Sequence, residues 1–360
     1  MPDNPPVITV KFVGRGPKHF GSRLWLRQFP DEKPRWGQCR FEFDPAAAKY
    51  DWLVVYDDLP PLEDERFSTR REVLPCPRRH TMLVTNEPVS VKIYGSAYLR
   101  QFGHVLSSQE PEMIRHPCHI YSQCGLRWFY GRGSSRLKSL DAMEASPPLA
   151  KTALISTVCS SKQQRHTLHR ARYLFTGELK KLIPELDVFG HGVRDMDDKA
   201  EALDAYRYHV AIENHLALHH WTEKLADAFL GCVLPFYHGC PNASDYFPAD
   251  SYIPIDINNL EDAARIIRNA MATNQYEKRL PFILEARRRV LREHNLFSLL
   301  PRLIEARHQP DARVADGGVL LSRRQARRSH PLLSMADFGN RIRLRFKGLF
   351  AHASADIARM

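Results

Sequence analysis

The chain has 360 residues, of which 43% are hydrophobic and 26% are charged. This balance is typical of a folded protein and excludes a disordered or fibrous chain, and the length suits two domains. The formal net charge of +11 favours an anionic partner, without choosing between a nucleotide, a nucleic acid and a lipid surface.

The cysteines and apolar runs bear on where the protein works. The seven cysteines are scattered, odd in number and free of any CxxC pair. They lack the spacing of a zinc site, and their pattern suits a reducing cytoplasm. The first residues lack the cationic start and long apolar run of a signal peptide. No uncharged apolar segment approaches the roughly 18 residues needed to cross a bilayer. We therefore expect a cytoplasmic protein without a membrane span.

Short apolar segments rich in β-branched residues recur along the chain and predict buried strands. They are residues 7–13, 52–56, 82–85, 153–158, 187–190, 209–212, 233–237 and 252–255. Between them, apolar residues return every three or four positions, which predicts helices at residues 170–182, 223–230 and 260–271. Alternating strands and helices imply an α/β fold with parallel sheets covered on both faces.

A small, polar and proline-containing segment, residues 131–148, separates two such α/β blocks. We therefore predict a first domain at residues 1–148 and a second at residues 149–307, closed by a long helical segment rich in Arg and Glu that begins at Gln275. Residues 308–360 form a basic tail, in which residues 308–329 have the composition of a loose linker.

The end of the tail has an amphipathic pattern. Five apolar residues share one face of a helical wheel, and Arg and Lys flank that face. The apolar residues are Phe338, Ile342, Phe346, Leu349 and Phe350. This favours an interfacial helix on an anionic membrane surface. One alternative is a helix packed on its own domain. Another is a strand, because apolar and basic residues alternate over residues 342–347.

The most informative stretch is residues 206–251. A strand is expected to end at Glu213 and Asn214, and Thr222 can cap a helix that begins at Glu223. In open α/β sheets, ligands sit at the carboxyl ends of strands, where helix N-termini face phosphates. Lys224 can then neutralise a diphosphate, while Glu223 can accept hydrogen bonds from two ribose hydroxyls. Alone, a Thr-Glu-Lys sequence would more often be an ordinary helix start.

The surrounding pattern resembles the family 10 glycosyltransferases, the α1,3/4-fucosyltransferases, of the bacterial type. That family's pattern runs FENS, about seven variable residues, TEK, a helix and then V/I-P-hydrophobic-x-x-G. The residues in register are Glu213, Asn214, Thr222, Glu223, Lys224, Pro235 and Gly239, and the resemblance covers roughly residues 153–291. It implies that Asn214, Glu223 and Lys224 bind the donor.

The chain departs from the family between these motifs. His215 replaces the family's Ser, and His219 and His220 replace an Asp-Tyr pair whose Tyr lies beside the donor. His220 is therefore a candidate donor-binding residue and a place where base or sugar preference can differ. The two histidines are adjacent and lack a third partner, so the sequence predicts no zinc site there.

The resemblance implies further donor contacts upstream. The segment of residues 160–179 is similar to the family's helix that aims an arginine at the donor phosphates, with Arg172 in the favoured position and Arg170 second. An arginine there suits the task, because its planar fork can hold phosphate oxygens bidentately. Residues 187–190 are similar to the family's D-V-F/Y-G segment, in which Gly190 either lets backbone approach the nucleotide or makes a turn.

The resemblance also implies a general base in the first domain. Glu87 follows a predicted strand in a segment similar to the family's T-G-E, and a strand-end Glu on a polar turn is the alternative. The competing acids are Asp57, Asp58 and Glu213. The Asp pair suggests a metal ligand, but adjacent carboxylates after a strand more often cap a turn, so we expect no metal requirement.

Together these features predict a GT-B fold, with two Rossmann-like domains facing a central cleft. The resemblance implies an inverting transfer of fucose from GDP-fucose to a hydroxyl of a glycan acceptor of N-acetylglucosamine type. The acceptor would be lipopolysaccharide or another surface glycan, or a glycan made in protein glycosylation. The enzyme would meet lipid-linked glycans at the inner face of the cytoplasmic membrane.

Three other functions stay open at this stage. A family member can use another GDP-sugar, and a donor-binding module can lack catalysis. The charge also allows a nucleic-acid-binding protein, but no RRM, KH or zinc-finger signature supports one.

Overall fold

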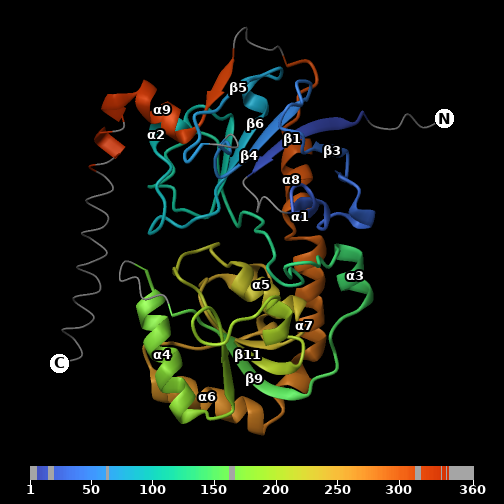
Figure 1. Ribbon diagram of the computed structural model, residues 1–360, viewed down its shortest axis with the longest axis vertical. Helices are drawn as coiled ribbons and strands as arrows, with labels where there is room; N and C mark the ends of the chain where they lie inside the picture. Colours follow the sequence, from blue (N-terminus) through green and yellow to red (C-terminus); the bar gives the residue numbers. More distant parts are fainter. Residues whose placement is uncertain are drawn as a thin grey trace. The chain divides into compact units, whose positions relative to one another are not determined.

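Figure 1 shows a computed structural model of the chain. The structure describes residues 6–14, 20–61, 65–161, 167–312, 318–333, 335–337 and 339. The chain divides into two compact units. Unit 1 comprises Met1–Ser22, Pro34–Cys124 and Leu300–Met360, and unit 2 comprises Arg23–Lys33 and Gly125–Leu299.

These units are discontinuous, unlike the predicted segments. Residues 125–148 belong to unit 2, and residues 300–307 belong to unit 1. The segment of residues 131–148 contains a short helix of its own, α3 (Leu140–Ala145), whose first turn is capped by the Ser139 hydroxyl. The limits at residues 148 and 307 stay a prediction.

Unit 2 is built on a five-stranded parallel sheet with the order β10-β9-β11-β12-β13. The strands are β9 (Ala153–Val158), β10 (Leu186–Phe189), β11 (Tyr206–Ile212), β12 (Leu234–His238) and β13 (Ile253–Pro254). Every residue of β12 is buried, as expected for a strand covered on both faces. The chain leaves β9 for one neighbour and returns on its other side as β11, which makes the β9–β11 junction the switch point of the sheet.

Helices cover this sheet, and Figure 1 shows α4 and α7 on opposite sides of it. The main helices of unit 2 are α4 (His169–Leu182), α5 (Glu223–Leu230), α6 (Leu260–Ala272) and α7 (Gln275–Arg292). Helix α8 (Leu296–Glu305) begins in unit 2 and continues into unit 1. The single long helix expected after Gln275 is divided into α7 and α8. The reason is local, because the Asn295 side chain accepts the N–H of Phe297 at 2.9 Å and so starts a new helix.

Unit 1 contains a seven-stranded sheet with the order β2-β3-β1-β4-β6-β7-β8. Its strands are β1 (Ile8–Gly14), β2 (Arg35–Trp36), β3 (Cys39–Glu42), β4 (Trp52–Tyr56), β6 (Thr81–Val84), β7 (His104–Ser107) and β8 (His119–Tyr121). All neighbours are parallel except β2 and β3. The α/β class and the two Rossmann-like units of a GT-B protein are therefore confirmed, and a facing cleft stays a prediction.

The expected loose linker is wrong for residues 318–329. Strand β14 (Val319–Leu321) pairs antiparallel with β5 (Arg71–Val73), and α9 (Arg323–Ser329) follows it. The Ser322 hydroxyl donates to the backbone oxygen of Ser68 at 2.9 Å, and Ala326 is buried. Backbone pairing orders this segment despite its polar composition. The amphipathic helix expected around residues 338–350 lies outside the described residues, apart from Gly339.

In the part of the chain that the structure describes, no helix is both long enough and apolar enough to cross a bilayer.

Candidate functional site

The candidate site lies at the switch point of the unit 2 sheet. Strand β9 ends at Val158, β11 ends at Ile212, and α4 follows β9 in the chain. The peptide groups of Cys159 and Phe189, and of Glu213 and His238, are hydrogen-bonded at this carboxyl edge. Open α/β sheets bind ligands at such an edge, where the connections that follow two neighbouring parallel strands run to opposite sides.

Arg172, from α4, reaches the end of β11. Its Nη1 donates to Oδ1 of Asn214 at 2.8 Å and to the backbone oxygen of Ile212 at 3.4 Å. The side chain is 7% exposed, and its Nε has no hydrogen-bond partner among the described residues. Buried guanidinium nitrogens are normally paired, so Arg172 keeps donor capacity for an anion.

Arg170, the second arginine predicted here, lies two residues before Arg172 on α4 and is exposed. Residues two apart on a helix point in different directions, so Arg170 is exposed whereas Arg172 is buried. The structure therefore brings Arg172, and not Arg170, to Asn214.

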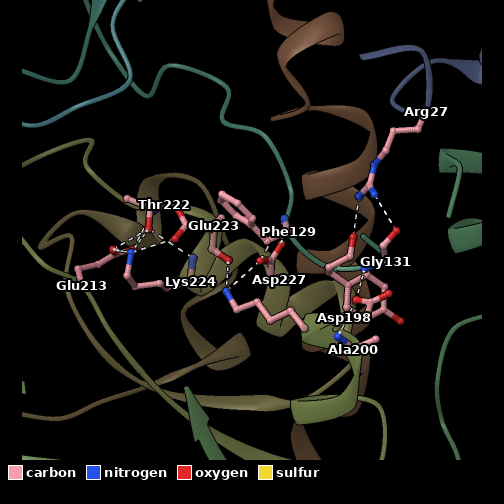
Figure 2. A network of polar contacts seen from close by, with 12 residues as sticks. Arg27, Phe129, Gly131, Asp198, Ala200, Glu213, Thr222, Glu223, Lys224 and Asp227 are labelled. Atoms are coloured by element: carbon pink, nitrogen blue, oxygen red, sulfur yellow. Dashed lines mark hydrogen bonds and ion pairs between the residues drawn. The ribbon is translucent and has the colours of Figure 1, made fainter. Parts of the chain in front are cut away.

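Glu213 is a buried carboxylate that organises the start of α5. Its Oε1 accepts the Thr222 N–H at 2.8 Å, and its Oε2 accepts the Thr222 hydroxyl at 2.7 Å. Thr222 in turn caps the helix, accepting the Lys224 N–H at 3.3 Å, as the sequence predicts. Figure 2 shows these side chains grouped at one end of α5. The Tyr237 hydroxyl also donates to Oε1, at 3.5 Å, so the contacts of the buried Glu213 carboxylate are those of a structural acid.

Glu223 and Lys224 stand in the first turn of α5. Lys224 Nζ lies 3.0 Å from Glu223 Oε1 and 3.4 Å from Glu213 Oε2. Burial lowers the pKa of Lys224, but the two carboxylates outweigh burial and raise it. Burial raises the pKa of Glu223, but the ammonium groups of Lys224 and Lys199 outweigh burial and lower it to about 2. Both residues are therefore charged at neutral pH.

The histidines at which the chain departs from the family, His215, His219 and His220, precede this turn in the chain. His220 is buried and its ring lies 5.5 Å from that of His215. Burial, His215 and Lys224 lower the pKa of His220 to about 3, so its imidazole is neutral. His219 has a positive φ of 61°, and its Nδ1 is hydrogen-bonded to the hydroxyl of Tyr246 at 2.6 Å. The pair therefore splits, with His220 beside the charged turn and His219 in a contact with Tyr246.

Trp221 anchors the same loop in the core. It is 2% exposed and its ring packs edge-on against Phe247 at 4.9 Å and His294 at 5.6 Å. A buried aromatic at this position fixes the loop just before Thr222 and Glu223, where α5 begins.

Gly190 lies beside the end of β9. Its φ is 135°, and a Cβ there would meet the backbone oxygen of Cys159 at 2.6 Å. Only glycine fits this close approach of two backbone segments at the switch point. Both readings made from the sequence remain compatible with this geometry.

Glu87 lies in unit 1, three residues after β6, and is half-buried. Its backbone oxygen accepts the side-chain amide of Gln109 at 2.7 Å. This contact fixes the backbone of the turn at the carboxyl edge of the unit 1 sheet, where the sequence places the candidate base.

The competing acids Asp57 and Asp58 have protein partners. Asp57 accepts the hydroxyl of Tyr94 at 2.7 Å and pairs with Lys92. Asp58 accepts the N–H of Arg323 at 3.0 Å. Within the described ranges, no group of three or more His, Cys, Asp or Glu residues could hold a metal ion.

Sequence reasoning missed two charged residues of this region, Lys199 and Asp227. Lys199 Nζ donates to Asp227 Oδ2 at 2.9 Å and to the backbone oxygen of Glu223 at 3.3 Å. Asp227 could have been found, because it lies four residues after Glu223 and so on the same helix face. Lys199 comes from a separate 3₁₀ turn, η3 (Lys199–Ala202), and no spacing points to it.

This arrangement combines a buried guanidinium, an ammonium and an ionised carboxylate at one sheet edge. The cations suit a diphosphate, and the carboxylate suits a pair of vicinal hydroxyls. This combination would suit a nucleotide-sugar ligand at the carboxyl edge of an α/β sheet.

Comparisons with known proteins agree with this chemistry. Residues 148–278 match the model of the glycosyltransferase family 10 (fucosyltransferase) C-terminal domain. No curated protein matches the sequence.

Solved structures give distant likenesses. An alpha1,3-fucosyltransferase with GDP-fucose is 14% identical, over 88% of this chain and 94% of its own, with a TM-score of 0.48. An alpha1,3-fucosyltransferase is 16% identical, over 82% and 93%, with a TM-score of 0.45. The apo form of the lipopolysaccharide outer core galactosyltransferase WaaB is 9% identical, over 83% and 100%, with a TM-score of 0.44.

The protein is thus a glycosyltransferase. More narrowly, residues 148–278 match the C-terminal domain of glycosyltransferase family 10, as the sequence pattern predicts.

Proposed function

We propose that the protein transfers L-fucose from GDP-fucose to a hydroxyl of a glycan acceptor, with inversion at the anomeric carbon. The observation that carries this proposal is the Arg172–Asn214 contact beside the Glu223–Lys224 turn, inside the segment that matches the family 10 model. In this proposal, Arg172 and Lys224 bind the diphosphate, Glu223 accepts the ribose hydroxyls, and Asn214 holds the Arg172 guanidinium in place.

The chemistry is a direct displacement. The acceptor oxygen forms a bond to the anomeric carbon of fucose, the bond from that carbon to the diphosphate breaks, and GDP leaves with the bonding electrons. Glu87 takes the acceptor proton as this happens. Arg172 and Lys224 stabilise the negative charge that develops on the departing diphosphate.

No metal is needed in this proposal, because two side-chain cations already serve the diphosphate. Chelation with EDTA should leave the transfer rate unchanged. A rate that falls with EDTA and returns with Mg²⁺ would refute the metal-free scheme.

The donor is tested by incubating the protein with GDP-fucose, GDP-mannose and other GDP-sugars and measuring release of GDP. The expected result is turnover of GDP-fucose. Turnover of another GDP-sugar without GDP-fucose would favour the second candidate, a family member with a different donor. The neutral, buried imidazole of His220, where the family has Tyr, is the observation that supports this second candidate.

The acceptor is proposed to be an N-acetylglucosamine-type residue of lipopolysaccharide or another surface glycan. Mass spectrometry of glycans from cells with and without the protein should differ by one deoxyhexose. Identical glycans would count against this acceptor class.

The place of action is proposed to be the inner face of the cytoplasmic membrane, reached through the basic C-terminal residues. The support is the sequence pattern, with eight basic residues and one acid between Leu321 and Phe350. The chain with and without residues 340–360 should be sedimented with anionic and with neutral vesicles. Only the full chain should follow the anionic vesicles.

A further inference from the structure

A buried ion pair lies under the first turn of α5, beside the donor residues. The side chain of Lys199 is 11% exposed and that of Asp227 is fully buried. Asp227 also accepts the backbone N–H of Phe129, at 3.2 and 3.3 Å from its two oxygens. Figure 2 shows Asp227 with Phe129 on one side and the Glu223 turn on the other. The pair therefore joins three segments of unit 2.

Lys199 contacts the backbone of Glu223 and the side chain of Asp227. Its Nζ is 2.9 Å from Asp227 Oδ2 and 3.3 Å from the backbone oxygen of Glu223. Glu223 and Asp227 are four residues apart on α5, a spacing at which like charges repel. An ammonium placed against both residues offsets that repulsion.

Among the residues that the structure describes, four charged or titratable groups face Glu223. Lys224 and Asp227 belong to its own helix, His220 belongs to the preceding loop, and Lys199 comes from η3. Lys224 is shared, because it also pairs with Glu213 and is proposed to bind the diphosphate. Lys199 is the cation whose contacts are with Asp227 and Glu223, so it remains beside Glu223 when Lys224 engages a ligand.

We infer that Lys199 is a positioning residue of the donor site, which fixes the first turn of α5 and keeps Glu223 ionised for hydrogen bonds from the nucleotide ribose. This inference rests on the proposed function of Glu223. It assigns Lys199 no contact with the substrate. The residue acts through Glu223 and Asp227.

The first test measures the dissociation constant of GDP between pH 4 and pH 8 by calorimetry. The variants are K199Q, which loses the charge but keeps a donor, and K199R, which keeps the charge. K138Q is the matched control, because Lys138 forms a half-exposed pair with Asp204 elsewhere in unit 2.

Wild type, K199R and K138Q should show parallel pH profiles, each including the protonation of the terminal phosphate of GDP at about pH 6. K199Q should lose up to roughly fourfold more affinity than wild type on going from pH 8 to pH 4, because without Lys199 the pKa of Glu223 rises toward its ordinary value near 4.5. A K199Q profile parallel to that of wild type would overturn the inference, since a purely structural residue changes affinity equally at each pH.

The second test does not depend on GDP. The melting temperatures of wild type, K199Q, E223Q and the double variant form a cycle at pH 7. K199Q should lower the melting temperature by at least about 2 °C more in wild type than in the E223Q background. Additive losses would overturn the inference. If wild type binds no GDP, the proposed function fails, and this cycle still decides whether Lys199 and Glu223 are coupled.

Discussion

Arg172 donates to the side-chain oxygen of Asn214 at 2.8 Å while its Nε has no partner among the described residues. A buried guanidinium held by two neutral oxygens, those of the Asn214 side chain and the Ile212 backbone, retains most of its charge for a ligand, since no carboxylate is paired with Arg172 within the described part of unit 2. The contact joins α4 to the end of β11 across the switch point. It links two motifs that are separated by 42 positions in the sequence.

R172A should therefore raise the dissociation constant of GDP by roughly 10- to 100-fold, as expected for loss of a charged hydrogen-bonding group. R172K should recover only part of the loss, because an ammonium cannot reproduce the fork. K181A, an exposed lysine on the same helix, is the control. Calorimetry with GDP gives each value. Equal affinities for R172A and K181A would remove Arg172 from the donor site.

E87Q should separate binding from chemistry. Removal of the carboxylate should lower the transfer rate by about 10²- to 10⁴-fold, the usual contribution of a general base, and leave GDP affinity unchanged. E112Q, at an exposed position of unit 1, should behave as wild type. Initial rates and GDP calorimetry on the same preparations provide the comparison. An E87Q enzyme with full activity would leave the base to be sought elsewhere.

The local pattern of the sequence was enough for much of the fold. The predicted strands at residues 52–56 and 153–158 and the predicted helix at residues 223–230 agree with β4, β9 and α5, and Thr222 caps α5. These elements combine a continuous apolar run with clear boundary residues, so neighbouring residues decide their structure. The class of the fold follows from their alternation.

Other features depend on contacts that spacing does not reveal. Strand β14 forms only because its backbone pairs with β5, more than 200 residues earlier. Lys199 reaches Asp227 from a 3₁₀ turn 28 positions away. The sequence favoured Arg172 over Arg170 through family spacing, whereas burial supplies the physical reason, because only one of two helix positions can face the sheet.

Two glycines of unit 2 should respond to alanine in opposite directions. G190A places a Cβ 2.6 Å from the backbone oxygen of Cys159 at a φ of 135°, so it should destabilise the protein by at least about 1–3 kcal/mol. Gly177 is inside α4, with nothing within 4 Å of its would-be Cβ, so G177A should stabilise by about 0.5–1 kcal/mol. Urea denaturation of both variants measures the difference. A neutral G190A would mean that the two backbone segments can separate.

Buried histidines should make the protein less stable as the pH falls from 7 to 5. Burial lowers the pKa of His209 to about 3, and His209 also bonds to the Ser156 hydroxyl at 2.8 Å. In the unfolded chain this pKa is near 6.5, so between pH 6.5 and 3 the unfolded state binds a proton that the folded state does not. The contribution of His209 to the free energy of unfolding is thus full above pH 6.5. It should fall by about 2 kcal/mol on going from pH 7 to pH 5.

H209Q removes this titration while leaving a polar side chain near Ser156, so its stability should fall less steeply over the same pH range. H191Q is the matched control, because His191 is exposed and paired only at the surface with Asp195. Urea denaturation at pH 7, 6 and 5 gives the slope for each protein. The slope of H209Q should be shallower by about 2 kcal/mol across the range, and that of H191Q should equal wild type. Equal slopes for H209Q and wild type would show that His209 takes up its proton without unfolding, through local opening of the β9–β11 region.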